Sequence, residues 1–166
     1  MSEIVAFFQG APNRNGLTVH DIHEFDRNRL ETKHDFIQWL FPTKSPSAFN
    51  PDVPSLTNRD IARFKRHRAY RKVLLANLEL MLAFYGFATG PNGIEKANNF
   101  RFATSQWVTP YNHNFMRISR MLDSLVTLHC RRQAVSFYRA LLHNLGDEPL
   151  LSSAFRHWRA KLGAFA

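Results

Sequence analysis

The chain has 166 residues, 45% of them apolar and 21% charged, a composition that excludes wholesale disorder and favours one folded domain. It carries 22 Lys and Arg against 13 Asp and Glu, a net charge of +9 with neutral His. This excess of cations permits binding to nucleic acid, acidic proteins or anionic lipid without deciding between them. The longest apolar run, Leu80–Ala88, has nine residues, whereas a membrane-spanning helix needs about 20. No transmembrane segment is therefore predicted.

The compartment is indicated by one cysteine and by the first residues of the chain. Cys130 is the only cysteine, so an intrachain disulfide is excluded and a thiol-ligated zinc site is not expected. The first ten residues contain Glu3 and lack a basic leading segment, unlike a secretory signal. We expect a soluble, cytoplasmic chain that needs no cofactor.

Helix-start signals organise the first half of the chain. Residues 1–17 are interpreted as an N-terminal arm. Thr18 with Asp21 forms a relative of the capping box, and the apolar positions after it predict a short helix, a break, and a second helix that ends before Pro42. Thr57 with Asp60 repeats the capping pattern and predicts another helix.

The second half of the chain contains four apolar stripes with helical spacing. The clearest runs from residue 70 to 85 and ends at Gly86 and Gly90, before a polar, irregular stretch from 91 to 110. Three more stripes predict helices within residues 115–126, 134–145 and 155–162. No segment alternates as a strand would. The predicted fold is all-α, a single irregular bundle of six or seven helices over residues 18–162, followed by a short tail at residues 163–166.

Motifs for metal binding or catalysis are not legible in the sequence. His20 and His23 lie one helical turn apart, but no HExxH or comparable ligand pattern accompanies them, so a solvated helix face is the simpler interpretation. Cys130 lies at the end of an apolar stripe, where packing is its simpler role. The sequence also lacks a GxSxG element, a P-loop and a dinucleotide fingerprint. We predict neither a metal site nor catalytic residues.

The densest charge feature is a basic stretch with six Lys or Arg in ten residues. Clustered cations neutralise phosphates, so this stretch could hold nucleic acid without sequence preference. The alternative is a solvated face that keeps a helical bundle soluble, and no recognition module such as a helix-turn-helix is legible. The candidate polyanion-binding residues are Arg63, Lys65, Arg66, Arg68, Arg71 and Lys72.

A second polar cluster covers residues 111–120. Asn112 or Asn114 can cap the helix that follows. Arg117 and Arg120 lie one turn apart and could hold a carboxylate or phosphate between them. They could equally pair with acidic side chains of other helices and serve only to orient those helices.

Four segments together carry a family resemblance. They are residues 30–42 (LETKHDFIQWLFP), 47–51 (SAFNP), 80–86 (LMLAFYG) and 113–122 (HNFMRISRML). In this order they resemble the conserved domain of the opioid growth factor receptor family, over roughly residues 18 to 160. The resemblance implies an α-helical domain, to which animal members add long tails and repeats; compact members are typical of bacteria and fungi. The animal protein is described as a receptor for the pentapeptide met-enkephalin at the nuclear envelope.

The resemblance implies a non-enzymatic domain that binds a peptide or protein partner, whose identity it leaves open. The alternative is the polyanion-binding module formed by residues 63–72. A third hypothesis is an enzyme built on the His34, Asp35, His113 and Arg117 set.

Two of these segments, residues 30–42 and 113–122, also predict a site. Their apolar residues should pack, while the polar ones should meet, with His34 or Asp35 within reach of His113, Arg117 or Arg120. Arginines in a packed bundle need partners. We expect a mostly buried network with one accessible edge. The candidate ligand-binding residues are His34, Asp35, Gln38, His113, Asn114, Arg117 and Arg120.

Overall fold

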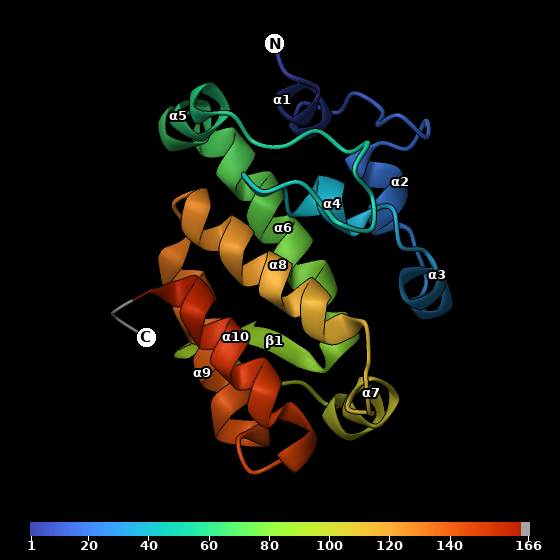
Figure 1. Ribbon diagram of the computed structural model, residues 1–166, viewed down its shortest axis with the longest axis vertical. Helices are drawn as coiled ribbons and strands as arrows, with labels where there is room; N and C mark the ends of the chain where they lie inside the picture. The colour runs from blue at the N-terminus through green and yellow to red at the C-terminus, as the bar shows by residue number, and fades with distance from the viewer. Residues whose placement is uncertain (164–166) are drawn as a thin grey trace. The chain divides into compact units, whose positions relative to one another are not determined.

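The computed structural model describes residues 1–163, which form ten α-helices, one 3-10 helix and one two-stranded sheet (Figure 1). The chain is mostly helical, but the all-α prediction is wrong in detail because Phe87–Gly90 and Gly93–Lys96 pair as antiparallel strands. Ten helices also exceed the six or seven predicted. Of the predicted tail, only Gly163 lies within the described residues. The chain divides into two compact units, residues 1–77 and 78–166.

The first unit is built from short helices with side-chain caps. Thr18 and Thr57 both form complete capping boxes, with Asp21 and Asp60 respectively, as predicted. Residues 3–8, within the predicted N-terminal arm, form a helix capped by Ser2. The elements are α1 (Glu3–Phe8), α2 (Val19–His23), α3 (Arg27–Thr32), α4 (Ile37–Leu40), α5 (Asn58–Arg66) and the first ten residues of α6 (Arg68–Tyr85).

Aromatic side chains fill the core of the first unit. The ring centroids of Phe8 and Phe64 lie 4.8 Å apart in an edge-to-face pair, and those of Phe7 and Trp39 lie 5.3 Å apart. The fully buried Asn77 donates from Nδ2 to the carbonyl oxygen of Leu40 at 3.0 Å. These contacts fix α4 between the N-terminal helix and α6, which positions the loop that precedes α5.

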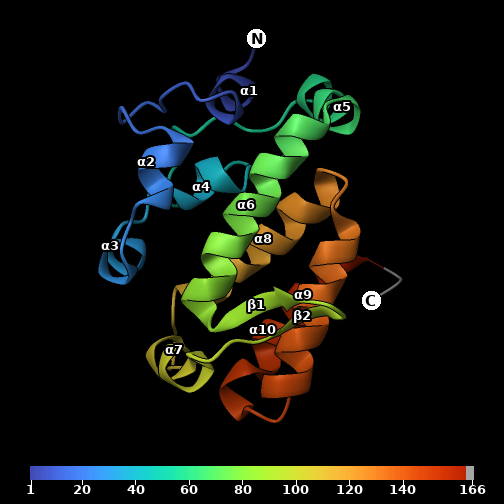
Figure 2. The same ribbon diagram turned by 180° about the vertical axis from the view of Figure 1, so that it is seen from behind.

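The second unit combines the last eight residues of α6 with a hairpin, four α-helices and one 3-10 helix. Its elements are β1 (Phe87–Gly90), β2 (Gly93–Lys96), α7 (Phe100–Trp107), α8 (Asn114–Thr127), α9 (Arg131–Leu145), η1 (Pro149–Leu151) and α10 (Ser152–Leu162). Helix α10 packs against α8 and α9, and β2 lies along α9 (Figure 2). The backbone N–H of Ile94 donates to Oγ of Ser136 at 2.9 Å, which anchors the hairpin to α9.

Buried indole groups hold the second unit together. Trp107 donates from Nε1 to the carbonyl oxygen of Tyr85 at 3.2 Å, and Trp158 donates to that of Phe115 at 2.9 Å. Both tryptophans are fully buried, so these hydrogen bonds satisfy donors that would otherwise be costly to bury. They tie α7 to the end of α6 and α10 to the start of α8.

Candidate functional site

The structure assigns the predicted ligand-binding residues to different units. His34 and Asp35 lie between α3 and α4, and Gln38 lies on α4, all in the first unit. The other four lie at the start of α8 in the second unit: His113, Asn114, Arg117 and Arg120. The candidate site thus has one half in each unit, and the expected contact between the two halves stays a prediction.

The half on α8 forms a buried polar network. Asn114 is fully buried, and its Oδ1 accepts from the hydroxyl of Tyr85 at 3.0 Å and from Nη1 of Arg117 at 3.4 Å. The Oδ1 of Asn112 accepts from the backbone N–H of Asn114 at 2.9 Å, which satisfies the first N–H of α8, whereas the N-cap position itself is His113. Burial lowers the pKa of Arg120 to about 10, although the negative charge of Asp123 acts to raise it. The guanidinium is still cationic at neutral pH. Inward-facing, mutually bonded groups such as Asn114 and Arg117 favour a structural role.

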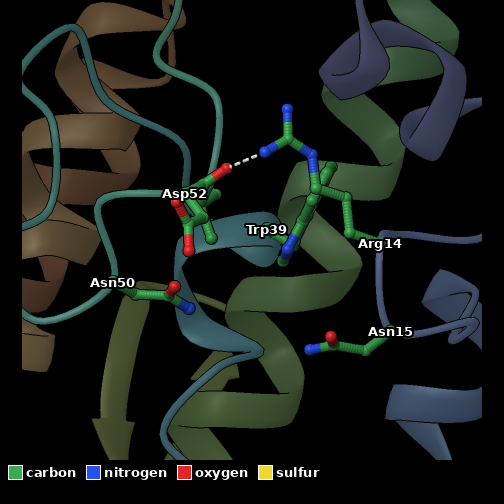
Figure 3. A pocket seen from close by; sticks show the side chains of 6 residues that line it. Arg14, Asn15, Trp39, Asn50 and Asp52 are labelled. Atoms are coloured by element: carbon green, nitrogen blue, oxygen red, sulfur yellow. Dashed lines mark hydrogen bonds between the residues drawn. The ribbon is translucent and has the colours of Figure 1, made fainter.

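The half in the first unit leads to a pocket. The carboxylate of Asp35 accepts a hydrogen bond from Nδ2 of Asn15 at 2.7 Å, and Asn15 lines a cavity of about 330 Å³. Three segments contribute its walls: the loop after α1, helix α4, and the loop between α4 and α5 (Figure 3). The lining residues are Arg14, Asn15, Trp39, Asn50, Asp52 and Val53.

Arg14 fastens the two loops that form the pocket. Its Nε and Nη2 donate to the two carboxylate oxygens of Glu3 at 2.8 and 2.6 Å, and its Nη1 donates to the carbonyl oxygen of Asp52. The paired hydrogen bonds raise the pKa of Arg14 and lower that of Glu3, so both remain ionised near neutral pH. Bidentate pairs of this kind orient both partners. The positive charge of Arg14 is therefore already matched, and the same side chain closes one end of the pocket.

The pocket also contains polar groups that the protein does not use. In Figure 3 the side-chain amides of Asn15 and Asn50 point inward from opposite sides. Within residues 1–163, neither the amide of Asn50 nor the carboxylate of Asp52 makes a hydrogen bond. Gln38, one of the predicted residues, does not line the pocket, although its buried Oε1 has no hydrogen-bond partner in the same residues. Unsatisfied donors and acceptors at a concave surface are available to a ligand.

Sequence reasoning missed this pocket. None of its lining residues is among the predicted candidates, although Trp39 and Asn50 lie in segments that carry the family resemblance. Apart from Trp39, the missed residues belong to loops rich in Pro, Asn and Gly, where binding residues are frequent but follow no periodic pattern. That composition was the one available signal.

The predicted polyanion-binding residues lie at the junction of α5 and α6. Arg63, Lys65, Arg66, Arg68 and Lys72 are exposed, and Arg71 is half-buried. No three His, Cys, Asp or Glu side chains gather as metal ligands within residues 1–163. Over the same range, none of the helices combines the length and apolar character that a membrane crossing requires.

Comparison with known proteins agrees with the resemblance seen in the sequence. Residues 7–160 match the model of the opioid growth factor receptor conserved region. The chain is 35% identical to the rat opioid growth factor receptor over 92% of this chain and 29% of that protein. It is 34% identical to the human receptor over 75% of this chain and 19% of that protein. A rat protein named opioid growth factor receptor-like protein 1 is 33% identical over 71% of this chain and 25% of its own length.

The match to the family model covers nearly all of the described residues, whereas the chain spans less than a third of the curated relatives it matches. No solved structure matches it. The match includes both units, the Trp39 wall of the pocket and the Asn114–Arg117 network. On this evidence the chain belongs to the opioid growth factor receptor family, and residues 7–160 correspond to the conserved region of that family.

Proposed function

We propose that this chain is a binding protein. Its first unit binds a peptide, or a segment of a protein, by contacting a cationic group of that ligand. The observation that carries the proposal is the pocket of about 330 Å³ in which the side chains of Asn50 and Asp52 make no hydrogen bond among the described residues, although the charge of Asp52 also acts on Arg14. Arg14 is neutralised by Glu3, so the charge left on the pocket wall is the carboxylate of Asp52, with that of Asp35 behind Asn15. A cation is the complementary ligand group.

The size and surroundings of the pocket favour a peptide over a free metabolite. Its volume is at the lower limit of small-ligand sites, which run from about 300 to 1,000 Å³, and suits one terminal residue or one basic side chain. Phe49, next to Asn50 in the chain, is 76% exposed and offers an apolar surface for an adjacent residue. The relatives are named as receptors, which supports a binding role.

The carboxylate of Asp52 provides the test. A random heptapeptide library with free amino termini is selected on the wild-type chain, and enriched peptides are titrated by calorimetry. We expect them to share a cationic group followed by an aromatic or aliphatic residue. The Asp52→Asn variant should weaken them at least tenfold, about 1.4 kcal/mol, because it removes the counter-charge and keeps the shape.

Asp147→Asn is the matched control, because Asp147 is exposed and lies outside the pocket. It should leave the affinity of the selected peptides unchanged. The proposal would be contradicted if the selected peptides bound the Asp52→Asn variant with the same affinity as the wild type. It would also be contradicted if no peptide were enriched.

A further inference from the structure

The positive charge of the first unit is concentrated at one corner. Residues 59–77 hold seven Lys and Arg against the single acid Asp60, whereas residues 1–58 hold five Lys and Arg against seven Asp and Glu. Asp60 is 3% exposed and already accepts hydrogen bonds from Ser2 and Thr57. The cations of this stretch therefore lack an accessible acidic neighbour within it.

Local structure accounts for only part of this cluster. Arg63, Lys65 and Arg66 lie in the last turn of α5, where the helix dipole favours cations. The chain then turns at His67 and starts α6, in whose first turns Arg68, Arg71 and Lys72 follow (Figure 2). Cations at a helix N-terminus are disfavoured by the dipole, and like charges spaced three or four residues apart repel. The second half of the cluster is therefore not explained by helix stability.

None of these six side chains is used inside the protein. Arg63, Lys65, Arg66, Arg68, Arg71 and Lys72 make no ion pair or hydrogen bond among the residues that the structure describes, although the charge of Arg63 acts on Asp60. The backbone that carries these side chains is anchored by two buried neighbours, Phe64 on α5 and Tyr70 on α6. The ring centroids of these two residues lie 5.4 Å apart. The result is a corner that is anchored by buried rings and whose cationic groups are exposed, except for the half-buried Arg71.

We propose that this corner, residues 63–72, binds the sugar–phosphate backbone of a double-helical nucleic acid. Four of the six cations are arginines, which bind phosphate oxygens through two parallel hydrogen bonds. No large apolar side chain within residues 59–77 is exposed, so the corner lacks the apolar anchor of a membrane-surface helix. It also lacks exposed Phe, Tyr or Trp rings on which single-stranded bases stack, since His67 is its one exposed aromatic side chain within the described residues. The surface provides charge without base contacts, which suits a duplex backbone.

Fluorescence anisotropy with a labelled 20-base-pair DNA duplex tests the proposal at several salt concentrations. If four to six phosphates are contacted, affinity should fall roughly 10²- to 10³-fold between 50 and 200 mM salt, since each contact contributes about −0.9 to the logarithmic slope. The Arg66→Gln, Arg68→Gln, Arg71→Gln variant should reduce the magnitude of that slope by nearly 3.

The control removes the same charge elsewhere, through Arg132→Gln, Arg156→Gln and Arg159→Gln, which change exposed arginines of α9 and α10. It should leave the slope unchanged. If circular dichroism shows that the first triple variant is unfolded, Lys65→Gln with Lys72→Gln replaces it, with an expected change of about 1.8 in slope.

Several outcomes would overturn the proposal. They are undetectable binding at 20 mM salt, an equal loss in the control variant, tighter binding of a single strand of the same length, and tighter binding of vesicles containing phosphatidylserine. The last two would assign the corner to a single strand and to a membrane, respectively. The proposal would likewise be refuted if polyglutamate displaced the labelled duplex at a lower concentration of charges than unlabelled duplex does. That result would assign the corner to an acidic protein.

Discussion

The carboxylate of Asp60 joins the start of α1 to the start of α5. It accepts from the Ser2 hydroxyl at 2.6 Å and from the N–H and hydroxyl of Thr57 at 2.9 and 2.7 Å, while Ser2 itself caps α1. Burial by itself raises the pKa of Asp60, but the hydrogen bonds from Ser2 and Thr57 and the charge of Arg63 outweigh it, so that the pKa lies below its ordinary value. The ionised form thus stabilises two helix termini.

We predict that Asp60→Asn costs about 2 kcal/mol of unfolding free energy at pH 7, because hydrogen bonds to a charged group are lost. A lowered pKa contributes stability that is fully present above the unfolded value, about 3.9, and is lost as the pH falls through the folded value. The difference between wild type and variant should therefore shrink below about pH 4. Urea unfolding at pH 7, 4 and 2.5 at constant ionic strength measures it. A difference that stays constant down to pH 2.5 would refute the assignment, and Asp147→Asn serves as the neutral control.

At the scale of elements, the junction between α6 and β1 requires a glycine. Gly86 has φ +92°, and a Cβ at this position would lie 2.8 Å from Cα of Phe100 and 2.9 Å from Cβ of Ala103. The close approach lets α7 pack against the end of α6, where Trp107 hydrogen-bonds to the carbonyl of Tyr85. Both the backbone conformation and the available space exclude a side chain.

Gly86→Ala should lower the unfolding free energy by about 3 kcal/mol, from positive φ and from displacement of the α7 backbone. Gly10→Ala is a matched control, because Gly10 has φ +98° and nothing within 4 Å of its Cβ position. It should cost only about 1 kcal/mol, the conformational part alone. Thermal and urea unfolding of both variants give the comparison, and equal losses would show that the contact with α7 is not tight.

The long helices and the shorter helices that begin with a capping box could be predicted from the sequence, whereas the hairpin and α7 could not. The stripes assigned to residues 70–85, 115–126, 134–145 and 155–162 correspond to α6, α8, α9 and α10, because two or more turns suffice to show a period of 3.6 residues. The strands of the hairpin have four residues each, too few to alternate visibly, although Asn92-Gly93, where the turn meets β2, is a typical turn signal. Helix α7, with apolar Phe100, Ala103 and Trp107, lay in a stretch interpreted as irregular.

The lining of the pocket is not among the predicted site residues. Trp39 and Asn50 belong to segments that carry the resemblance, but Trp39 is predicted only to pack and Asn50 has no predicted role. The rest of the pocket depends on Arg14 reaching a carbonyl oxygen 38 residues away. Such a contact between two irregular loops leaves no periodic trace in either of them, since it depends on how the surrounding helices place the loops.

At the scale of the molecule, one helix belongs to both units. Helix α6 runs from Arg68 to Tyr85, and the boundary between the units follows Asn77. The two parts, ten and eight residues long, are each shorter than the roughly 12 to 15 residues at which isolated helices become marginally stable in water. Neither part is expected to persist when the unit that packs against it unfolds.

We therefore predict a single cooperative unfolding transition for the whole chain. The three indole N–H signals report on it without mutation, since Trp39 lies in the first unit and Trp107 and Trp158 lie in the second. In ¹⁵N-labelled protein their folded signals should disappear at the same urea concentration. Loss of the Trp39 signal well before the other two would show that the units unfold independently.

The shared helix also bears on how members of this family can be recombined or shortened. Most multi-unit proteins can be divided at an exposed linker, which frees each part for separate expression or exchange. A chain ended after Asn77 would lose Leu78, Met81 and Leu82 from the helix, and one that began there would lose the turns preceding them. A chimaera of two relatives joined at this point must keep the 18-residue helix in register, because a one-residue insertion rotates everything after it by about 100° around the helix axis. Loop lengths on either side can then vary while the junction itself stays fixed in length.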